Sequence, residues 1–136
     1  MYDSNKIKNS NLLFPELSYQ IKGAILKVWK ELGPAFKEVV YQRALEKEFK
    51  NSDIKFESQK QIPIYYDSEK VGVYIPDFII EDKIILEIKQ LPFLGFKENQ
   101  QAWYYLKGSH YKLLLLINFG GERLQIKRIV YDKARK

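Results

Sequence analysis

The sequence predicts a single α/β or α+β domain in which helices pack against a mixed β-sheet, with the elements in the order ααβββαββ. Three observations lead to this prediction. The apolar residues follow a helical period up to residue 50 and an alternating period from residue 56. Residues 111–117 (YKLLLLI) are apolar on both faces, as in a central strand covered by helices on each side. The length of 136 residues and the hydrophobic fraction of 46% suit one domain.

We expect this domain to span residues 18–131, after a polar leader at 1–17 and before a basic tail at 132–136. The first predicted helix covers 18–32 and ends at Gly33 and Pro34, which commonly follow a helix. Its apolar positions recur at steps of three and four: Ile21, Ala24, Ile25, Val28 and Leu32. A second helix fits 36–50. The residues that we expect it to turn inward are Phe36, Val39, Val40, Ala44 and Phe49.

The rest of the chain alternates between apolar runs and turn residues. The predicted strands are 56–65, 71–80, 84–88, 111–117 and 123–130. Polar turns at 67–70 and 81–83 separate the first three strands. Pro92 and Gly95 interrupt the chain before a third helix at 96–107. The sequence therefore places strands on both sides of that helix.

The composition limits the kinds of site that the chain can carry. Zero Cys excludes disulfides, Cys-ligated metals and a cysteine nucleophile, and fits a reducing compartment. A single His leaves oxygen atoms as the metal ligands, which favours Mg²⁺, Mn²⁺ or Ca²⁺. The net charge of +6 favours an anionic partner, with nucleic acid first. The N-terminus lacks a signal-peptide pattern and the longest apolar run is too short for a membrane span, so we expect a cytoplasmic protein.

Two carboxylates face each other in the second predicted hairpin. If 81–83 forms a three-residue turn, Asp77 lies opposite Glu87. Directly opposed residues have Cβ atoms about 5 Å apart, a distance at which two carboxylates repel by about 3 kcal/mol at an effective dielectric near 20. A divalent cation between them offsets this repulsion, because Mg²⁺ is usually held by one or two carboxylates with water and phosphate. Lys89 lies two residues beyond Glu87, on the same face.

An ordinary hairpin with one solvated face explains the same residues, and a one-residue change in the turn would remove the opposition. Two helical pairs accompany the hairpin. Glu38 and Tyr41 are three apart and lie off the inward stripe of the second helix, and Gln101 and Tyr105 are four apart on the third helix. For either pair alone, a solvated face or an aromatic core position is the simpler interpretation. Their combination with the hairpin favours a functional site.

Taken in order, these motifs resemble the PD-(D/E)XK nucleases. Pro76 and Asp77 match the PD motif, and residues 87–89 (EIK) match the EXK motif. Gln101 and Tyr105 match the QxxxY motif of the RecB and lambda-exonuclease branch. The resemblance implies a restriction-endonuclease-like core.

A closer resemblance is to the small bacterial and archaeal GxxExxY proteins. It rests on Glu38 and Tyr41, on the strands and on the run 117–130 (INFGGERLQIKRIV). Ala35 stands where the Gly that opens the family signature is expected. The resemblance covers about residues 17–130, nearly the whole chain.

The resemblance implies a metal centre. Asp77 and Glu87 would bind Mg²⁺ or Mn²⁺, with the backbone carbonyl of Ile88 as a further ligand. Glu38 would reach the metal directly or through water. A metal-activated water is a nucleophile near neutral pH, as phosphodiester hydrolysis requires.

The resemblance also implies contacts to the substrate. Lys89 would orient the attacking water or stabilise the charge that builds on the phosphate. Gln101 and Tyr105 would position the scissile strand. Further candidates for backbone contact and base stacking, each individually more typical of a basic surface or an aromatic core, are Lys97, Lys107, Lys127, Arg128, Trp103 and Tyr104.

The leading hypothesis is a metal-dependent nuclease that hydrolyses phosphodiester bonds of DNA or RNA. The alternatives are a catalytically inactive nuclease-fold module that binds nucleic acid or a partner, and a plain interaction domain whose carboxylates pair with Lys89. A domain this small offers little surface for gripping a duplex, which favours a homodimer or a larger assembly. Gly120 and Gly121 lack the Lys and Ser or Thr of a P-loop, and His110 has no recognisable triad setting.

Overall fold

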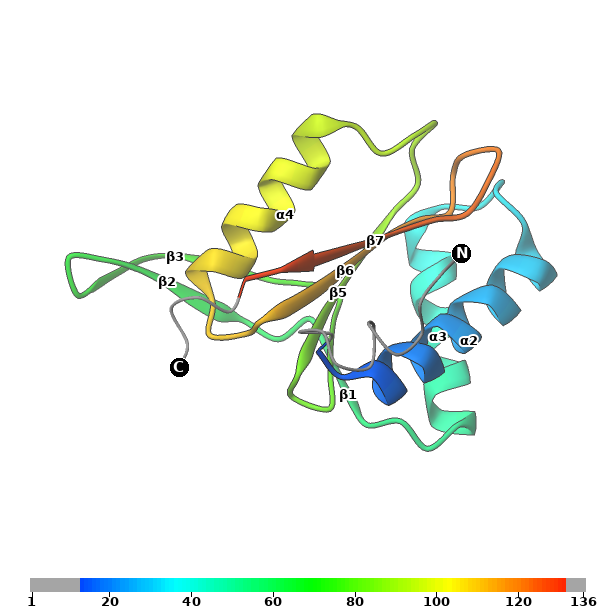
Figure 1. The fold of residues 1–136 in the computed structure, drawn as a ribbon, viewed down its shortest axis with the longest axis horizontal. Coiled ribbons are helices and arrows are strands. Elements are labelled where there is room, and N and C mark those ends of the chain that lie inside the picture. The colour runs from blue at the N-terminus through cyan, green and yellow to red at the C-terminus, as the bar shows by residue number, and fades with distance from the viewer. Residues whose placement is uncertain (1–12, 132–136) are drawn as a thin grey trace, which may run out of the picture.

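The computed structural model describes residues 13–131, which form three helices and seven strands (Figure 1). The helices are α2 (Pro15–Leu32), α3 (Glu38–Asn51) and α4 (Phe96–Gly108). The strands are β1 (Phe56–Ser58), β2 (Ile62–Tyr66), β3 (Glu69–Tyr74), β4 (Phe78–Ile80), β5 (Ile84–Lys89), β6 (Leu113–Asn118) and β7 (Gln125–Val130). Residues 1–12 of the predicted leader and the predicted tail at 132–136 lie outside the described residues. None of the three helices is long and apolar enough to cross a membrane.

Five of the strands form one mixed sheet in the order β1-β4-β5-β6-β7. β5 and β6 run parallel, and the other neighbours are antiparallel. The parallel pair is joined by a crossover through α4, as parallel strands require. β2 and β3 form a separate hairpin that projects beyond the sheet (Figure 1). The predicted α/β class, with a mixed sheet flanked by helices, is confirmed.

The two faces of the sheet bury different helices (Figure 1). α2 and α3 cover the face that carries Ile84, Leu86 and Ile88 of β5, and α4 covers the face that carries Ile85. Every residue of β6 is buried, which confirms the prediction of a central strand. Because side chains alternate along a strand, Glu87 and Lys89 of β5 lie on the α4 face.

Two strand predictions are wrong in their extent. Residues 56–65 and 71–80 each divide into two strands, so that β1 and β4 stay in the main sheet while β2 and β3 leave it. Gln59, with a φ of 58°, turns the chain between β1 and β2. Pro76 lies between β3 and β4, where it cannot donate a hydrogen bond to a sheet ladder.

The predicted inward face of the second helix is wrong in part. Phe49 is buried as predicted, but Phe36 and Val39 are 42% and 47% exposed. The buried residues of α3 recur at four-residue steps: Tyr41, Leu45 and Phe49. The Tyr41 ring stacks on Phe119 with centroids 4.2 Å apart, and its hydroxyl donates a hydrogen bond to the Gly33 carbonyl. Tyr41 is therefore a core residue that also fixes the turn between α2 and α3.

Candidate metal and active site

The hairpin of β4 and β5 has the predicted register. Ile80 pairs with Ile84 across the turn, and Asp77, directly before β4, comes opposite Glu87. Oδ2 of Asp77 accepts a hydrogen bond from the backbone N–H of Ile88 at 2.7 Å. This side-chain bond continues the ladder beyond the last backbone pair. It holds the Asp77 carboxylate against β5, next to Glu87.

Glu87 lies in an environment that disfavours its charge. Burial, together with the neighbouring Asp77 carboxylate, raises the pKa of its carboxyl from 4.5 to about 7. A hydrogen bond from the Tyr74 hydroxyl and the charge of Lys89 act in the opposite direction. Burial and Glu87 raise the pKa of Tyr74 as well, so its hydroxyl keeps its proton and remains a donor. Two carboxyls, one hydroxyl and one ammonium group therefore meet on the α4 face of the sheet, from Asp77, Glu87, Tyr74 and Lys89.

This donor set fits a hard divalent cation. Two partly buried carboxylates side by side repel each other, and a cation between them would favour the ionised form of both. Within residues 13–131, no group of three acidic or His side chains is arranged to hold a metal. Two carboxylates are nevertheless a common protein contribution to a Mg²⁺ site, which is completed by water and phosphate.

Glu38 and Lys89 lie at the end of β5 beyond the carboxylate pair. Glu38 is the first residue of α3, and its Oε2 accepts a hydrogen bond from the backbone N–H of Gln90 at 3.2 Å. The Gln90 side chain donates to the carbonyl of Pro34 at 2.6 Å. These bonds bring the start of α3 next to Lys89. The structure gives Glu38 no direct contact with Asp77 or Glu87.

The QxxxY pair of α4 connects to the carboxylates through Tyr74. Nε2 of Gln101 donates to the Tyr105 hydroxyl at 3.2 Å, and the Tyr105 ring stacks on Tyr74 with centroids 4.1 Å apart. Tyr74 in turn donates to Glu87. Tyr74 was not predicted as a site residue, because strict alternation along one strand at 71–80 would place it on the face opposite Asp77. Pro76, which interrupts that strand, was the one sign in the sequence that the alternation does not continue.

Asn118, which is fully buried at the end of β6, was also not predicted from the sequence. Its Oδ1 accepts from the Leu91 N–H and its Nδ2 donates to the Leu91 carbonyl, both at 2.9 Å. It also bonds to the Gly120 N–H and to Gln125. A Cβ on Gly120 would come within 2.5 Å of the Leu91 nitrogen. Asn118 and Gly120 thus fix the path of the chain as it leaves β5, directly beyond the site.

A family model described as the PD-(D/E)XK nuclease superfamily matches residues 15–129. The chain belongs to the PD-(D/E)XK nuclease superfamily. No curated protein and no solved structure gave a match. The matched span contains every residue of the candidate site, from Glu38 to Tyr105. Nucleases of this superfamily typically use a divalent metal, in agreement with the donor set around Asp77 and Glu87.

The basic and aromatic residues of this PD-(D/E)XK domain that were predicted to contact nucleic acid fall into two groups. Some are held in contacts within the protein, and the others are exposed. The Arg128 guanidinium donates to the Leu13 carbonyl at 2.7 Å and to Ser18 Oγ at 3.3 Å, so it ties β7 to the start of α2. Trp103 is partly buried and packs edge-on against Tyr131. The remaining candidates are exposed: Lys97, Tyr104, Lys107 and Lys127.

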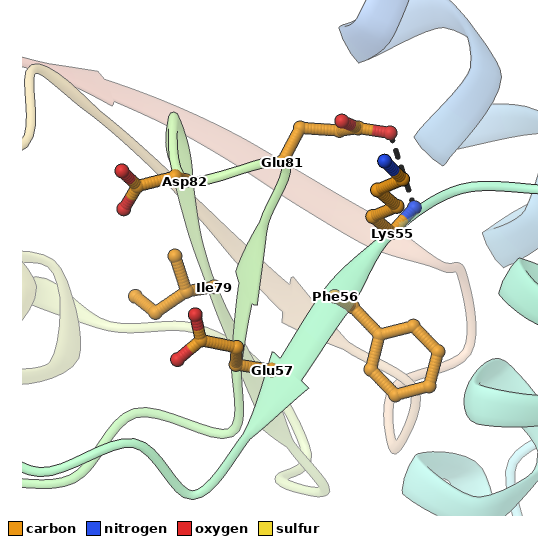
Figure 2. Close-up of a pocket in the computed structure, with 6 residues that line it drawn as sticks. All are labelled: Lys55, Phe56, Glu57, Ile79, Glu81 and Asp82. Carbon is orange, nitrogen blue, oxygen red and sulfur yellow. Dashed lines mark hydrogen bonds between the residues drawn. The ribbon is translucent and has the colours of Figure 1, made fainter.

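A separate cavity of about 270 Å³ lies at the other end of the β4–β5 hairpin (Figure 2). Three acidic residues line it, Glu57, Glu81 and Asp82, together with Lys55. Glu81 turns toward Lys55 and accepts a hydrogen bond from its backbone N–H at 3.1 Å (Figure 2). These carboxylates are not arranged as a metal-ligating group among the described residues. The PD-(D/E)XK motifs therefore mark the Asp77 end of this hairpin as the candidate site.

Proposed function

We propose that this protein is a metal-dependent nuclease that hydrolyses phosphodiester bonds of DNA or RNA. The observation that carries the proposal is the Asp77–Glu87 pair. Two carboxylates are held side by side on a buried sheet face, and the pKa of Glu87 is raised to about 7. Titratable groups whose pKa values are shifted in this way are concentrated at functional sites. Membership of a nuclease superfamily supports the same chemistry.

Each residue of the site has a task in this proposal. Asp77 and Glu87, with the backbone carbonyl of Ile88, would hold Mg²⁺ or Mn²⁺, and Glu38 would contribute directly or through water. The bound cation supplies a nucleophilic water near neutral pH and offsets charge on the phosphate. The Lys89 ammonium lies on the same strand face as Glu87 and would stabilise the negative charge that develops on the phosphate oxygens.

The aromatic and amide side chains would position the reacting groups. Tyr74 fixes the Glu87 carboxylate through its hydrogen bond and supports Tyr105 by stacking. Gln101 is exposed on α4 beside Tyr105, where its amide can bond to a phosphate or sugar of the scissile strand. The scissile strand would then pass between α4 and the carboxylate pair.

We further propose that the chain belongs with the GxxExxY proteins, which the order of its motifs resembles. The small size of the domain supports action as a homodimer or as a subunit of a larger assembly. A net charge of +6 supports nucleic acid as the partner.

Cleavage of labelled oligonucleotides tests the proposal. The wild type is incubated with single- and double-stranded DNA and RNA in Mg²⁺, in Mn²⁺ and in EDTA, beside Asp77→Asn and Lys89→Met. We expect metal-dependent cleavage that falls at least about 100-fold in both variants, because Asp77→Asn weakens the hold on the cation and Lys89→Met removes a positive charge that would stabilise the transition state. Glu31→Gln, on the exposed surface of α2, is the matched control and should cleave normally.

Circular dichroism must show that all the variants are folded. If the wild type binds nucleic acid but cuts none of these substrates in either metal, and Asp77→Asn binds equally well, the protein is instead an inactive nuclease-fold binding module.

A further inference from the structure

A crease lined by aromatic residues runs between the β2–β3 hairpin and the C-terminal end of α4. It consists of an inner hollow of about 60 Å³ and an outer one of about 350 Å³. The two hollows adjoin each other, since Ile62, Gly108 and Ser109 line both. Gly108 borders open space, because a Cβ there would meet nothing within 4 Å.

Flat aromatic rings are spaced along this crease from its inner to its outer end. Tyr74 and Tyr105, stacked on each other, line the inner hollow together with Tyr104, which is 57% exposed. Tyr65 lines the outer hollow and is 64% exposed. Exposed tyrosines that line adjoining hollows are suited to a ligand that stacks.

The inner end of the crease adjoins the candidate active site, and Tyr74 is the residue that the two share. Tyr74 lines the inner hollow with its ring and donates its hydroxyl proton to a hydrogen bond with Glu87. Two lysines lie along the outer part. Lys60 lines the outer hollow and forms ion pairs with Glu57 and Asp82 at 3.6 and 4.0 Å, and the exposed Lys70 pairs with Tyr65 across the hairpin. A chain of bases and phosphates lying in the crease would therefore meet tyrosine rings, the ammonium group of Lys70 and, beyond Tyr74, the carboxylate pair.

We propose that the crease binds single-stranded nucleic acid, whose bases stack on Tyr104 and Tyr65 while its backbone runs toward Asp77 and Glu87. This proposal rests on the proposed nuclease function and names its substrate class. Base faces are accessible in a single strand, whereas those inside a duplex are already stacked on one another. Stacking on aromatic side chains together with a basic track is the general mode of single-strand binding.

Binding measured without metal separates this proposal from catalysis. Fluorescein-labelled (dT)12, (U)12 and a 12-base-pair duplex are titrated in EDTA, and the fluorescence anisotropy is followed. We expect the single strands to bind more tightly than the duplex. Tyr104→Ala and Tyr65→Ala should each weaken single-strand affinity by roughly 5- to 150-fold, the range for loss of one stacked base.

Two controls show whether stacking is responsible. Tyr104→Phe keeps the ring and should bind like the wild type. Tyr19→Ala removes a tyrosine that is 80% exposed on α2, which covers the opposite sheet face, and should have no effect. Urea unfolding of each variant shows that the fold is retained.

Each outcome decides the proposal. Equal or tighter binding of the duplex, unchanged affinity in both alanine variants, or no binding of either single strand overturns it. The nuclease function fails separately: tyrosine-dependent single-strand binding without cleavage in Mg²⁺ or Mn²⁺ supports the crease and rejects the enzyme. Cleavage that is unchanged in both Tyr104→Ala and Tyr65→Ala supports the nuclease function and rejects strand binding in the crease.

Discussion

In the absence of metal, replacing Glu87 by Gln should stabilise the protein at alkaline pH. A pKa of about 7 in place of 4.5 means that ionising Glu87 costs up to about 3 kcal/mol more in the fold than in the unfolded chain. Below pH 4.5 the group is protonated in both states and the cost is absent. Between pH 4.5 and 7 the unfolded chain loses the proton first, so the stability of the wild type falls. Above about pH 7 the loss is complete.

Urea unfolding in EDTA at pH 4.5, 6 and 8 measures this effect. The gain of Glu87→Gln over the wild type should grow from near zero at pH 4.5 to as much as about 3 kcal/mol at pH 8. Gln can still accept the hydrogen bond from Tyr74, so the variant removes the charge with little change in shape. Glu31→Gln removes an exposed carboxylate and should show no such rise. A Gln variant that is no more stable than the wild type at pH 8 refutes the reasoning.

Three further predictions concern residues that support the site. Tyr74→Phe removes the hydrogen bond that lowers the pKa of Glu87, so a ¹³C NMR titration of that carboxyl should give a pKa above that of the wild type; an unchanged value contradicts this. Asn118→Ala leaves buried backbone groups unpaired and should lower the free energy of unfolding by about 2–4 kcal/mol, measured in urea. Gly120→Ala forces a Cβ against the backbone after β5 and should cost about 1–3 kcal/mol in the same assay, whereas Gly23→Ala, in the interior of α2 with open space around it, should stabilise the protein by about 0.5–1 kcal/mol.

The hairpin at the centre of the site was predictable because its pattern is strictly local. A three-residue turn between two apolar runs fixes which residues oppose each other, and the observed pairing of Ile80 with Ile84 follows directly. The central strand β6 was predictable for a similar reason, since only a strand covered on both faces is apolar at successive positions. Local patterns of this kind carry the fold class and the position of the two carboxylates.

The contacts around the carboxylates depend on long-range packing and could not be read from local patterns. Tyr74 reaches Glu87 because the chain breaks at Pro76 and restarts on another strand, which alternation along one strand cannot represent. Tyr41 fits the pattern of an exposed functional residue equally well, but it fills the core against Phe119, far along the chain. In both cases the partner, and not the local spacing, decides which way the side chain faces.

Calorimetric titration of Mn²⁺ into the wild type and into Asp77→Asn, each alone and with a single-stranded oligonucleotide, tests the central claim most directly. Circular dichroism confirms that both proteins are folded. We predict binding to the wild type that is lost or at least about tenfold weaker in the variant, because a carboxylate ligand has been removed. Equal binding by the two proteins, or no binding by the wild type under either condition, would contradict the assignment of Asp77 and Glu87 as a metal site.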